Sequence, residues 1–300
     1  MNVVVTGGCG YIGTELVLEL NDDCDVTVID RRDPKTPIPG VKYVREEIGG
    51  SHCNDTMLFG YLEGADVIYH LAADPRIQAT LDTPSKAFYS NCLATHHILD
   101  AVRHLSTPRL VFSSTSSVYG NITKSGYRSV ETDQRQYLNP YALSKGTSED
   151  WCYMYSQLYG VDVVVLRYFN VYGGDEDVTS PYAMVVGKFL NQVKMGKSLT
   201  VNGNGSQTRD FTFISDIIAG TVSAGDIDNK DVVGEVINIG SGTSYTIKEL
   251  AEMVSGNITY GPPARGEAMH TRADNRKAYE LLGWEPTVDI LEWAKHEIKK

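Results

Sequence analysis

Gly7, Gly10 and Gly13 stand three residues apart near the start of the chain. The segment that they span stands between a short apolar run at residues 3–5 and apolar residues at helical spacing over 16–20, and a second apolar run follows at 26–29. This order of strand, glycine turn, helix and strand within about 30 residues is typical of a βαβ unit that binds a dinucleotide. The turn therefore predicts a parallel sheet from the first residues of the chain.

Further apolar runs at residues 67–69, 110–112 and 163–166 alternate with predicted helices at 85–104 and 141–159. Strands that alternate with helices predict a parallel sheet covered on both faces. The expected fold class is α/β, a Rossmann-type doubly wound sheet with a smaller mixed α/β C-terminal lobe.

The pattern becomes looser after about residue 175. Short strands are expected at 199–201 and 236–239, and helices at 247–255 and 276–282. We therefore expect an NAD-binding domain over residues 1–174, to which residues 210–240 return. Residues 175–300 form mainly a substrate lobe.

Net charge and cysteine content restrict the partners of the chain. A formal charge of −11 and a pI near 5.1 argue against nucleic acid or an anionic membrane as the main partner. The five cysteines are widely spaced and form no Cys-x-x-Cys pair, which predicts reduced thiols, no metal site and a cytoplasmic protein. The chain opens without a signal-peptide pattern, and no apolar run is long enough for a membrane span.

Asp30 ends the second predicted strand, 17 residues after Gly13. A carboxylate at this place accepts hydrogen bonds from an adenosine ribose and repels a 2′-phosphate, so it favours NAD. Arg31 and Arg32 follow directly and leave NADP open as the alternative cofactor.

Tyr141 and Lys145 are four residues apart in a predicted helix and therefore share one face. A neighbouring cation lowers the pKa of a phenol from its ordinary value of about 10. The pair predicts a tyrosine base that takes a proton from a sugar hydroxyl.

Ordered motifs along nearly the whole chain resemble the extended short-chain dehydrogenase/reductases, in particular the nucleotide-sugar epimerase/dehydratase group. The motifs that carry the resemblance, beside the glycine turn and the Tyr141/Lys145 pair, are His70-Leu71-Ala72-Ala73, Ser113-Ser114-Thr115-Ser116-Ser117-Val118-Tyr119-Gly120, Arg167-Tyr168-Phe169-Asn170-Val171-Tyr172-Gly173, Gly203-Asn204-Gly205-Ser206-Gln207-Thr208-Arg209-Asp210-Phe211, Asn238-Ile239-Gly240-Ser241-Gly242 and Arg265-Gly266-Glu267. Glu47 stands where the family usually has Asp, a mild departure.

The resemblance implies roles for residues that match the family's motifs. The implied catalytic residues are Thr115, Tyr141 and Lys145. The implied NAD-binding residues are Gly7, Gly10, Tyr11, Ile12, Gly13, Asp30, Arg31, Glu47, Ile48, Leu71, Ala72, Ala73, Asn91, Ser113, Tyr141, Lys145 and Tyr168. The implied substrate-binding residues are Thr115, Asn170, Val185, Thr200, Arg209 and Arg265, with Arg209 at the diphosphate and Arg265 at the diphosphate or the ribose.

The resemblance also implies hydride transfer at C4 of a sugar on a nucleoside diphosphate, with Tyr141 as base, Thr115 as its hydrogen-bond partner and Lys145 as the cation that lowers the tyrosine pKa. Dehydratases of the family carry an Asp-Glu pair after the catalytic threonine, and decarboxylases usually carry a Glu there. This chain has Ser116 and Ser117. We therefore expect an NAD-dependent 4-epimerase of a UDP-hexose, of the UDP-glucose/galactose or UDP-glucuronate type.

Other functions remain open at this stage. They are a 4-ketoreductase, a dehydratase or decarboxylase and, more remotely, a non-catalytic dinucleotide sensor. Family members usually dimerise through two helices, which here match about 85–104 and 141–159, so a homodimer is expected.

Overall fold

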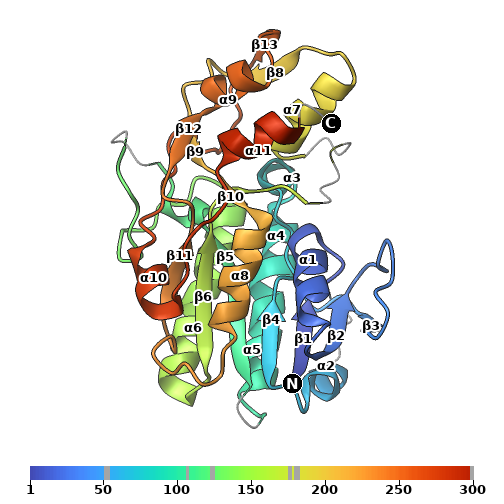
Figure 1. Cartoon of the computed structure of the whole chain (residues 1–300). Helices are drawn as coiled ribbons and strands as arrows, with labels where there is room; N and C mark the ends of the chain where they lie inside the picture. Colours follow the sequence, from blue (N-terminus) through green and yellow to red (C-terminus); the bar gives the residue numbers. More distant parts are fainter. Residues whose placement is uncertain (51–54, 106–107, 122–125, 175–177, 179–182, 298–300) are drawn as a thin grey trace.

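The computed structural model describes residues 1–50, 55–105, 108–121, 126–174, 178 and 183–297. Its centre is a seven-stranded parallel sheet in the order β11-β6-β5-β4-β1-β2-β3 (Figure 1). The strands of this sheet are β1 (Asn2–Thr6), β2 (Asp25–Asp30), β3 (Lys42–Arg45), β4 (Val67–His70), β5 (Arg109–Thr115), β6 (Val163–Tyr168) and β11 (Val236–Ile239). The chain moves outward from β1 in one direction and then in the other, which confirms the predicted doubly wound α/β fold.

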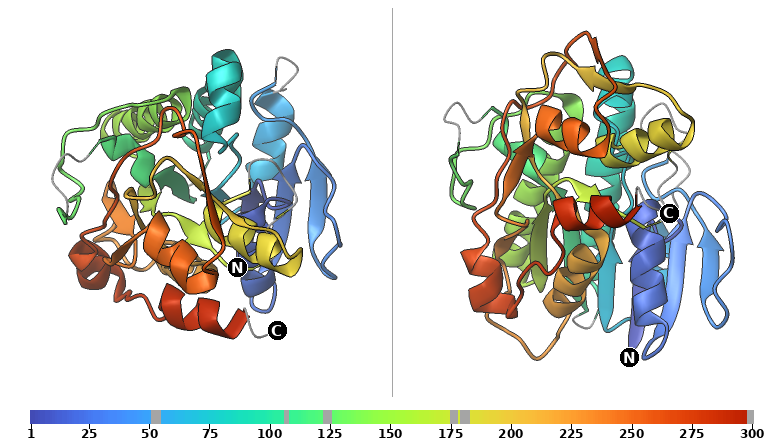
Figure 2. Two further views of the ribbon diagram at one scale, coloured as in Figure 1. Left: turned by 90° about the horizontal axis from the view of Figure 1, so that it is seen from above. Right: turned by 45° about the horizontal axis from the view of Figure 1, so that its top comes forward.

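Helices cover both faces of the sheet because successive strand residues point to opposite sides (Figures 1 and 2). In β1, Val3 and Val5 belong to a core shared with α1 (Tyr11–Leu20), α8 (Ile214–Ala224) and α10 (Arg276–Leu282). Val4 faces the other core, with α2 (Asp55–Leu62), α5 (Ala94–Val102) and α6 (Pro140–Tyr159). The apolar strand runs are therefore buried on both sides.

The helix expected at 85–104 is interrupted. It consists of α4 (Pro84–Ala87), a π-helical turn η1 (Phe88–Leu93) and α5, and α3 (Ile77–Asp82) precedes it. A π turn shifts the helical phase by one residue and is frequently found at functional sites. Here it holds Asn91, whose contacts are described below.

A smaller lobe lies beyond the carboxyl ends of the strands, on the side of the sheet opposite the N-terminus (Figure 1). Its core joins apolar residues such as Phe189, Leu199, Leu250 and Ile290. The helices of the lobe and its connections are α7 (Val185–Lys194), α9 (Ile247–Val254) and α11 (Ile290–Glu297). Three two-stranded sheets accompany them, in which β10 (Thr212–Phe213) pairs with β7 (Val171–Tyr172), β12 (Ser244–Thr246) with β9 (Thr208–Asp210), and β13 (Ile258–Gly261) with β8 (Leu199–Asn202). A short 3₁₀ turn, η2 (Ser116–Tyr119), follows β5.

Most predicted elements are present, but α7 was missed in the loosely patterned stretch after residue 175. Its buried side chains, Val186 and Phe189, pack on α9 and β8, and apolar residues recur at helical spacing along it, so the helix carried a local signal that the prediction did not use. The short strands β7, β9, β10, β12 and β13 were missed because each has five residues or fewer and pairs with a distant segment.

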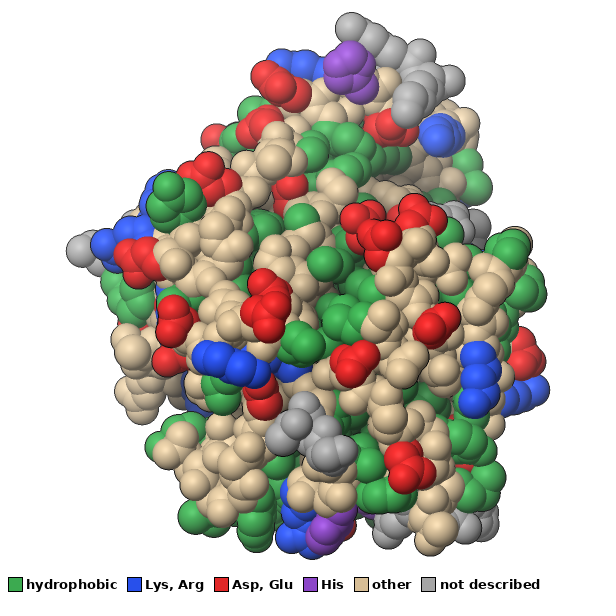
Figure 3. Space-filling model, turned by 60° about the horizontal axis from the view of Figure 1, so that its bottom comes forward, with side chains coloured by type: hydrophobic (Ala, Val, Ile, Leu, Met, Phe, Trp, Pro, Cys, Tyr) green, Lys and Arg blue, Asp and Glu red, His purple; other side chains and the backbone are tan. Residues whose placement is uncertain are grey.

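The surface view in Figure 3 shows acidic side chains scattered among basic, polar and apolar ones, in keeping with the net charge of −11. Within the described part of the chain, no helix has the length and hydropathy that crossing a bilayer requires. Cys9, Cys24, Cys92 and Cys152 are free thiols, and Cys53 lies outside the described residues.

Candidate active site

A cavity of about 530 Å³ opens at the carboxyl ends of β1, β2, β4, β5 and β6. Ligands of open α/β sheets bind at this edge, where neighbouring crossover connections leave in opposite directions. The glycine turn after β1 forms one wall, and the residues that follow β4 and β5 form the opposite wall.

Two glycines of the turn have no room for a side chain. A Cβ atom on Gly13 would lie 2.2 Å from the carbonyl oxygen of Gly7. Gly7 has a φ of +76°, and a Cβ there would lie 2.6 Å from the backbone nitrogen of Ala72. The turn therefore brings backbone amides to the N-terminus of α1, an arrangement that suits a pyrophosphate.

Asp30 is buried at the end of β2, where its carboxylate accepts hydrogen bonds from the backbone N–H groups of Cys9 (3.1 Å) and Arg32 (2.9 Å). These bonds fix the carboxylate at the cavity wall. Arg31 lies 3.6 Å from Glu47, and Arg32 lies 3.6 Å from Asp30. Each arginine at this end thus has a carboxylate partner, which lowers the positive potential that a 2′-phosphate would need.

The cavity brings together sixteen of the seventeen residues predicted to bind the cofactor. They are Gly7, Gly10, Tyr11, Ile12, Gly13, Asp30, Arg31, Glu47, Ile48, Leu71, Ala72, Ala73, Ser113, Tyr141, Lys145 and Tyr168. The closed glycine turn, the fixed carboxylate and the volume fit an adenine dinucleotide.

Asn91 lies behind the cavity and does not belong to its lining. Its side-chain amide accepts from the backbone N–H of Asp74 at 2.7 Å and donates to the Ser144 hydroxyl at 2.8 Å. Ser144 lies between Tyr141 and Lys145 in sequence. In this structure Asn91 therefore ties the segment after β4 to the catalytic helix.

Tyr141, Lys145 and Thr115 meet where β5 ends beside the first turns of α6. Asn139 caps this helix by accepting a 2.7 Å hydrogen bond from the backbone N–H of Ala142. Lys145 is buried, and its Nζ donates to the carbonyl oxygen of Ser113 at 2.6 Å. The Lys145 Nζ also lies 4.6 Å from the centroid of the Phe112 ring.

The pKa values of the pair differ from the sequence-based expectation. Burial raises the pKa of Tyr141 to about 12, and the hydrogen bond from Thr115 and the positive charge of Arg76 lower it from a still higher value. Burial lowers the pKa of Lys145 to about 8. Lys145 was expected to lower the tyrosine pKa, but desolvation dominates here and the lowering groups are Thr115 and Arg76.

A buried ion pair anchors the catalytic helix to the sheet. Glu149, one turn after Lys145, accepts two hydrogen bonds from the Arg167 guanidinium of β6, at 2.6 and 3.0 Å. Ser114 of β5 donates to the same carboxylate, and Arg135 lies 3.4 Å from it.

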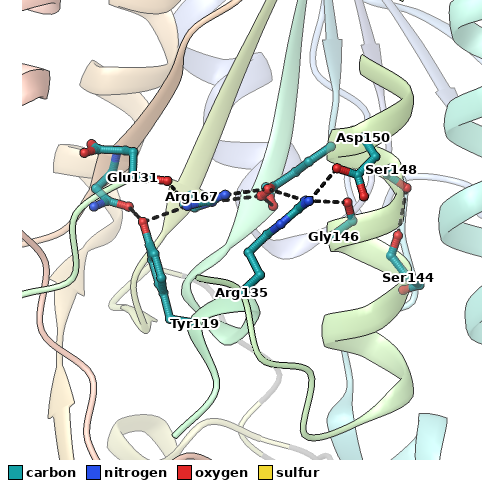
Figure 4. Close-up of polar contacts among 11 residues, drawn as sticks. Tyr119, Glu131, Arg135, Ser144, Gly146, Ser148, Asp150 and Arg167 are labelled. Carbon is teal, nitrogen blue, oxygen red and sulfur yellow. Dashed lines mark hydrogen bonds and ion pairs between the residues drawn. The ribbon is translucent and has the colours of Figure 1, made fainter. Parts of the chain in front are cut away.

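Figure 4 shows how this network continues on both sides of the ion pair. Arg167 donates to the Tyr119 hydroxyl at 2.9 Å and to the carbonyl oxygen of Glu131 at 3.0 Å. Arg135 reaches Asp150 and the carbonyl oxygen of Gly146, at 2.9 Å. The network fixes α6 relative to β5 and β6, the two strands beside the catalytic side chains.

A second cavity of about 330 Å³ lies between the sheet and the smaller lobe. Asn170, Val185, Thr200 and Arg209, all predicted to bind substrate, line it. Thr115 lines the first cavity, and the exposed Arg265 lines neither.

Arg209 is the main charged group of this cavity wall. Its guanidinium lies 3.1 Å from the carboxylate of Glu267, and burial lowers its pKa. The pair closes one end of the cavity, far in sequence from the catalytic residues. A buried guanidinium with a single carboxylate partner retains donors for an anionic ligand.

The two cavities share part of their walls. The shared residues are Pro75, Arg76, Ile77, Ser116, Ser117, Asn170, Val171 and Met184. Ser116 and Ser117 follow Thr115 directly, so the two cavities meet beside Thr115. The larger cavity holds Tyr141, Thr115 and Lys145 next to this junction with the smaller one.

Comparison with known proteins gives the same picture. The family model described as the NAD dependent epimerase/dehydratase family matches residues 3–240. The chain belongs to this NAD-dependent epimerase/dehydratase family. The predicted family and its NAD dependence are thereby confirmed.

Individual relatives cover almost the whole chain. An uncharacterized UDP-glucose epimerase of Bacillus subtilis is 33% identical over 99% of this chain and 97% of its own. A UDP-N-acetyl-alpha-D-glucosaminuronate decarboxylase of Bacillus cytotoxicus is also 33% identical, over 99% of this chain and 96% of its own. The crystal structure of the UDP-glucuronic acid 4-epimerase of Bacillus cereus, in complex with UDP-glucuronic acid and NAD, is 31% identical with a TM-score of 0.88 and covers 100% of this chain and 98% of that chain.

In this member of the epimerase/dehydratase family, sequence reasoning missed several cavity residues. Arg76, Gln78, Lys188 and Gln207 line the cavities but were not predicted. Arg76 stands in the loop after β4, three residues after the His70–Ala73 motif. Its charge so close to that motif was the signal that could have predicted it. Lys188 lies on the missed helix α7 and gave no signal without it.

Proposed function

We propose that this protein is a nucleotide-sugar 4-epimerase that uses NAD and acts on a UDP-hexose. The observation that carries the proposal is the position of Thr115, Tyr141 and Lys145 beside the wall shared by the two cavities. A sugar joined to a nucleoside diphosphate in the second cavity reaches these side chains, and a dinucleotide in the first cavity lies against them.

Tyr141 acts as the base. Its phenolate oxygen takes the proton of the sugar 4-hydroxyl as the C4–H bond breaks, and the hydroxyl so formed returns the proton after the keto sugar has turned over. Thr115 donates a hydrogen bond to the tyrosine oxygen and lowers its pKa, so it stabilises the phenolate. A phenol with a pKa of about 12 is a weak base at neutral pH, so nearby positive charge is required.

NAD, when bound, supplies the hydride acceptor and a positively charged ring. Lys145 lies one turn from Tyr141 and adds a second cation, which its hydrogen bond to Ser113 holds in place. Its lowered pKa of about 8 leaves it mostly protonated at neutral pH.

Arg209 binds the diphosphate in this proposal, with Thr200 and Val185 beside the nucleoside and Asn170 beside the sugar. The support is their place in the lining of the second cavity. The contact of Arg265 with the diphosphate or the ribose is likewise a proposal, and its side chain is exposed. We also propose that the other predicted cofactor residues, Asn91 included, have the roles expected of them. The division into residues 1–174 and 175–300 is a further proposal.

Ser116 and Ser117 favour epimerisation over elimination. A dehydratase needs acid–base groups for protons at C5 and C6, and these two positions beside Thr115 carry hydroxyls. Epimerisation needs no further carboxylate, because one base serves both directions. Decarboxylation is the second candidate, and the similar decarboxylase of Bacillus cytotoxicus supports keeping it.

A direct assay separates these functions. The purified protein is incubated with UDP-glucose or UDP-glucuronate without added reductant, and the products are identified by NMR. We expect the 4-epimer in a reversible equilibrium. A UDP-pentose and carbon dioxide would identify a decarboxylase, and formation of a 4-keto sugar only with added NADP⁺, which is reduced stoichiometrically, would identify a ketoreductase running in reverse.

Tyr141→Phe is the matched variant. It removes the hydroxyl and keeps the ring, so kcat is expected to fall by about 10²- to 10⁴-fold. NAD affinity, measured by calorimetry, is expected to stay near that of the wild type. Full turnover in the variant would contradict Tyr141 as the base.

We also propose a homodimer in the cytoplasm. Exposed apolar side chains on η1 and α6 support a helical interface, among them Phe88 and Tyr89 at 55% and 54% exposure and Tyr153 at 64%. Light scattering of the purified protein measures the oligomeric state, and fractionation of cells measures the location. A monomer at micromolar concentration would contradict the first part.

A further inference from the structure

One end of the dinucleotide cavity is formed by a tight turn that follows β3. The backbone N–H of Gly50 donates to the carbonyl oxygen of Glu47 at 3.0 Å and closes this turn. Just before the turn, the backbone N–H of Glu46 donates to the carbonyl oxygen of Asp30 at 2.9 Å, at the end of β2. Residues 46–49 therefore line the cavity beside Asp30.

The place of this turn in the sheet assigns one half of NAD to it. The pyrophosphate is expected at the glycine turn after β1, and the adenosine ribose is expected at Asp30, after β2. Strand β3 is the next strand beyond β2, at the edge of the sheet (Figure 1). The adenine is therefore expected at the turn after β3, and the nicotinamide on the opposite side of β1, towards Tyr141.

Two contacts tie the turn to the helical segment η1 and α5. His97 lies on α5, and its Nδ1 is 3.0 Å from the carbonyl oxygen of Ile48. A carbonyl oxygen only accepts, so Nδ1 carries the proton and donates. Gly49 packs on η1, where an added Cβ atom would lie 2.0 Å from the carbonyl oxygen of Tyr89. His97 itself lines neither of the two cavities.

The same helical segment also reaches the cavity directly. Ser90 of η1 and Ala94 of α5 belong to its lining, and Ile48 is buried in a core that includes Ala94. The turn and the helical segment thus form one adenine wall, whose two parts are joined by the His97 hydrogen bond and the Gly49 contact. A shift of the turn away from the helices changes the space that this wall offers to the base.

We propose that His97 is a positioning residue for the adenosine half of NAD and that Gly49 permits the close packing on which the same wall depends. His97 acts through the carbonyl oxygen of Ile48, so its loss lets the turn move and lowers the affinity for adenosine. The nicotinamide half is held by other segments, near Tyr141, and keeps its affinity. Neither His97 nor Gly49 takes part in proton or hydride transfer.

The test compares the two halves of the cofactor. Calorimetry with the purified protein measures the affinities for NAD, for AMP, which carries the adenosine, and for NMN, which carries the nicotinamide. His97→Leu removes one hydrogen bond, so NAD and AMP are expected to bind about 3- to 10-fold more weakly, both by the same factor. NMN is expected to bind as it does to the wild type. A general loss of structure would instead weaken both halves.

His97→Asn is the conservative variant, because its side-chain amide offers an N–H donor close to the place of Nδ1. It is expected to restore the affinities for NAD and AMP to within about twofold of the wild type. His104→Leu is the matched control, since His104 is an exposed histidine just beyond α5 that lines neither cavity. It is expected to change none of the three affinities.

Gly49→Ala tests the second contact. Its Cβ forces the turn away from Tyr89, so AMP is expected to bind more than about 10-fold more weakly, with NMN again unchanged. The melting temperature of each variant establishes that it is folded, and the His97 variants decide the question if Gly49→Ala does not fold.

Equal losses of AMP and NMN affinity in His97→Leu would overturn the inference. Unchanged AMP affinity in the folded His97→Leu protein would overturn it as well. The outcome is independent of the proposed function, because all three ligands are measured without a sugar nucleotide.

Discussion

The two cavities of this protein are built in different ways. The dinucleotide cavity is formed by backbone at the ends of neighbouring parallel strands, with two glycines whose missing side chains make room. The second cavity is formed by side chains from segments around residues 76, 139, 185, 209 and 267. The cavity proposed for the cofactor is thus shaped by main-chain geometry, and the cavity proposed for the sugar nucleotide is shaped by side chains.

Helix α6 lines the dinucleotide cavity through Tyr141 and Lys145, and the largest predicted effect concerns the anchor of this helix. Glu149→Gln breaks a buried ion pair with Arg167 and is expected to lower the free energy of unfolding by about 3–5 kcal/mol. Urea titration measures the free energy of unfolding of each variant. Asp150→Asn, at an exposed partner of Arg135, is the control and should cost about 1 kcal/mol or less. A similar loss of unfolding free energy in both variants would show that the stability of the network does not depend on Glu149.

Lys145 lies in the dinucleotide cavity and makes stability depend on pH. Its pKa is about 8 in the folded protein and ordinarily 10.5, so between these values the unfolded chain binds more protons and stability rises with pH. Between pH 8 and 10.5 the free energy of unfolding of the wild type is expected to rise by on the order of 3 kcal/mol relative to that of Lys145→Met. Thermal unfolding of the NAD-free proteins across this range measures the difference. Parallel stability curves would contradict a lowered Lys145 pKa.

Arg209 tests the second cavity alone. Arg209→Gln removes the charge that we propose contacts the diphosphate, equally before and during reaction, so KM should rise by about 10- to 100-fold while kcat changes little. NAD affinity should stay unchanged. Arg276→Gln is the control, since Arg276 is exposed and pairs with Asp274 away from both cavities. A fall in kcat with constant KM would place Arg209 in the chemical step.

Gly13 tests the dinucleotide cavity alone. Its added Cβ would lie 2.2 Å from the Gly7 oxygen, so Gly13→Ala is expected to cost about 1–3 kcal/mol of stability and to weaken NAD binding. Gly60→Ala is the control, because nothing lies within 4 Å of a Cβ there, in α2. It is expected to raise stability by about 0.5–1 kcal/mol. Equal NAD affinity in wild type and Gly13→Ala would mean that the turn adapts to a side chain.

Much of the dinucleotide cavity could be predicted because its signals are local. The turn at Gly7–Gly13 and the carboxylate of Asp30 lie within one βαβ unit, where spacing in sequence fixes spacing in the fold. Asn91 shows the limit of such reasoning. The π turn that contains it buries its side chain between Asp74 and Ser144, behind the cavity wall.

The second cavity could be predicted only in part. Arg209 stood in a motif that resembles one of the family's motifs, but Lys188 lies on α7, a helix that was not predicted although apolar residues recur at helical spacing along it. The pairing of Arg209 with Glu267, 58 residues later, follows from tertiary structure alone.

The sequence by itself determined the parallel sheet, the glycine turn and the spacing of Tyr141 and Lys145, because strand and helix periods act over a few residues. Only the tertiary structure decided which groups surround the tyrosine. Burial raises its pKa to about 12, and Thr115 and Arg76, from strand and loop ends far apart in sequence, oppose that rise. Desolvation and charge act through space, so they depend on how distant segments meet.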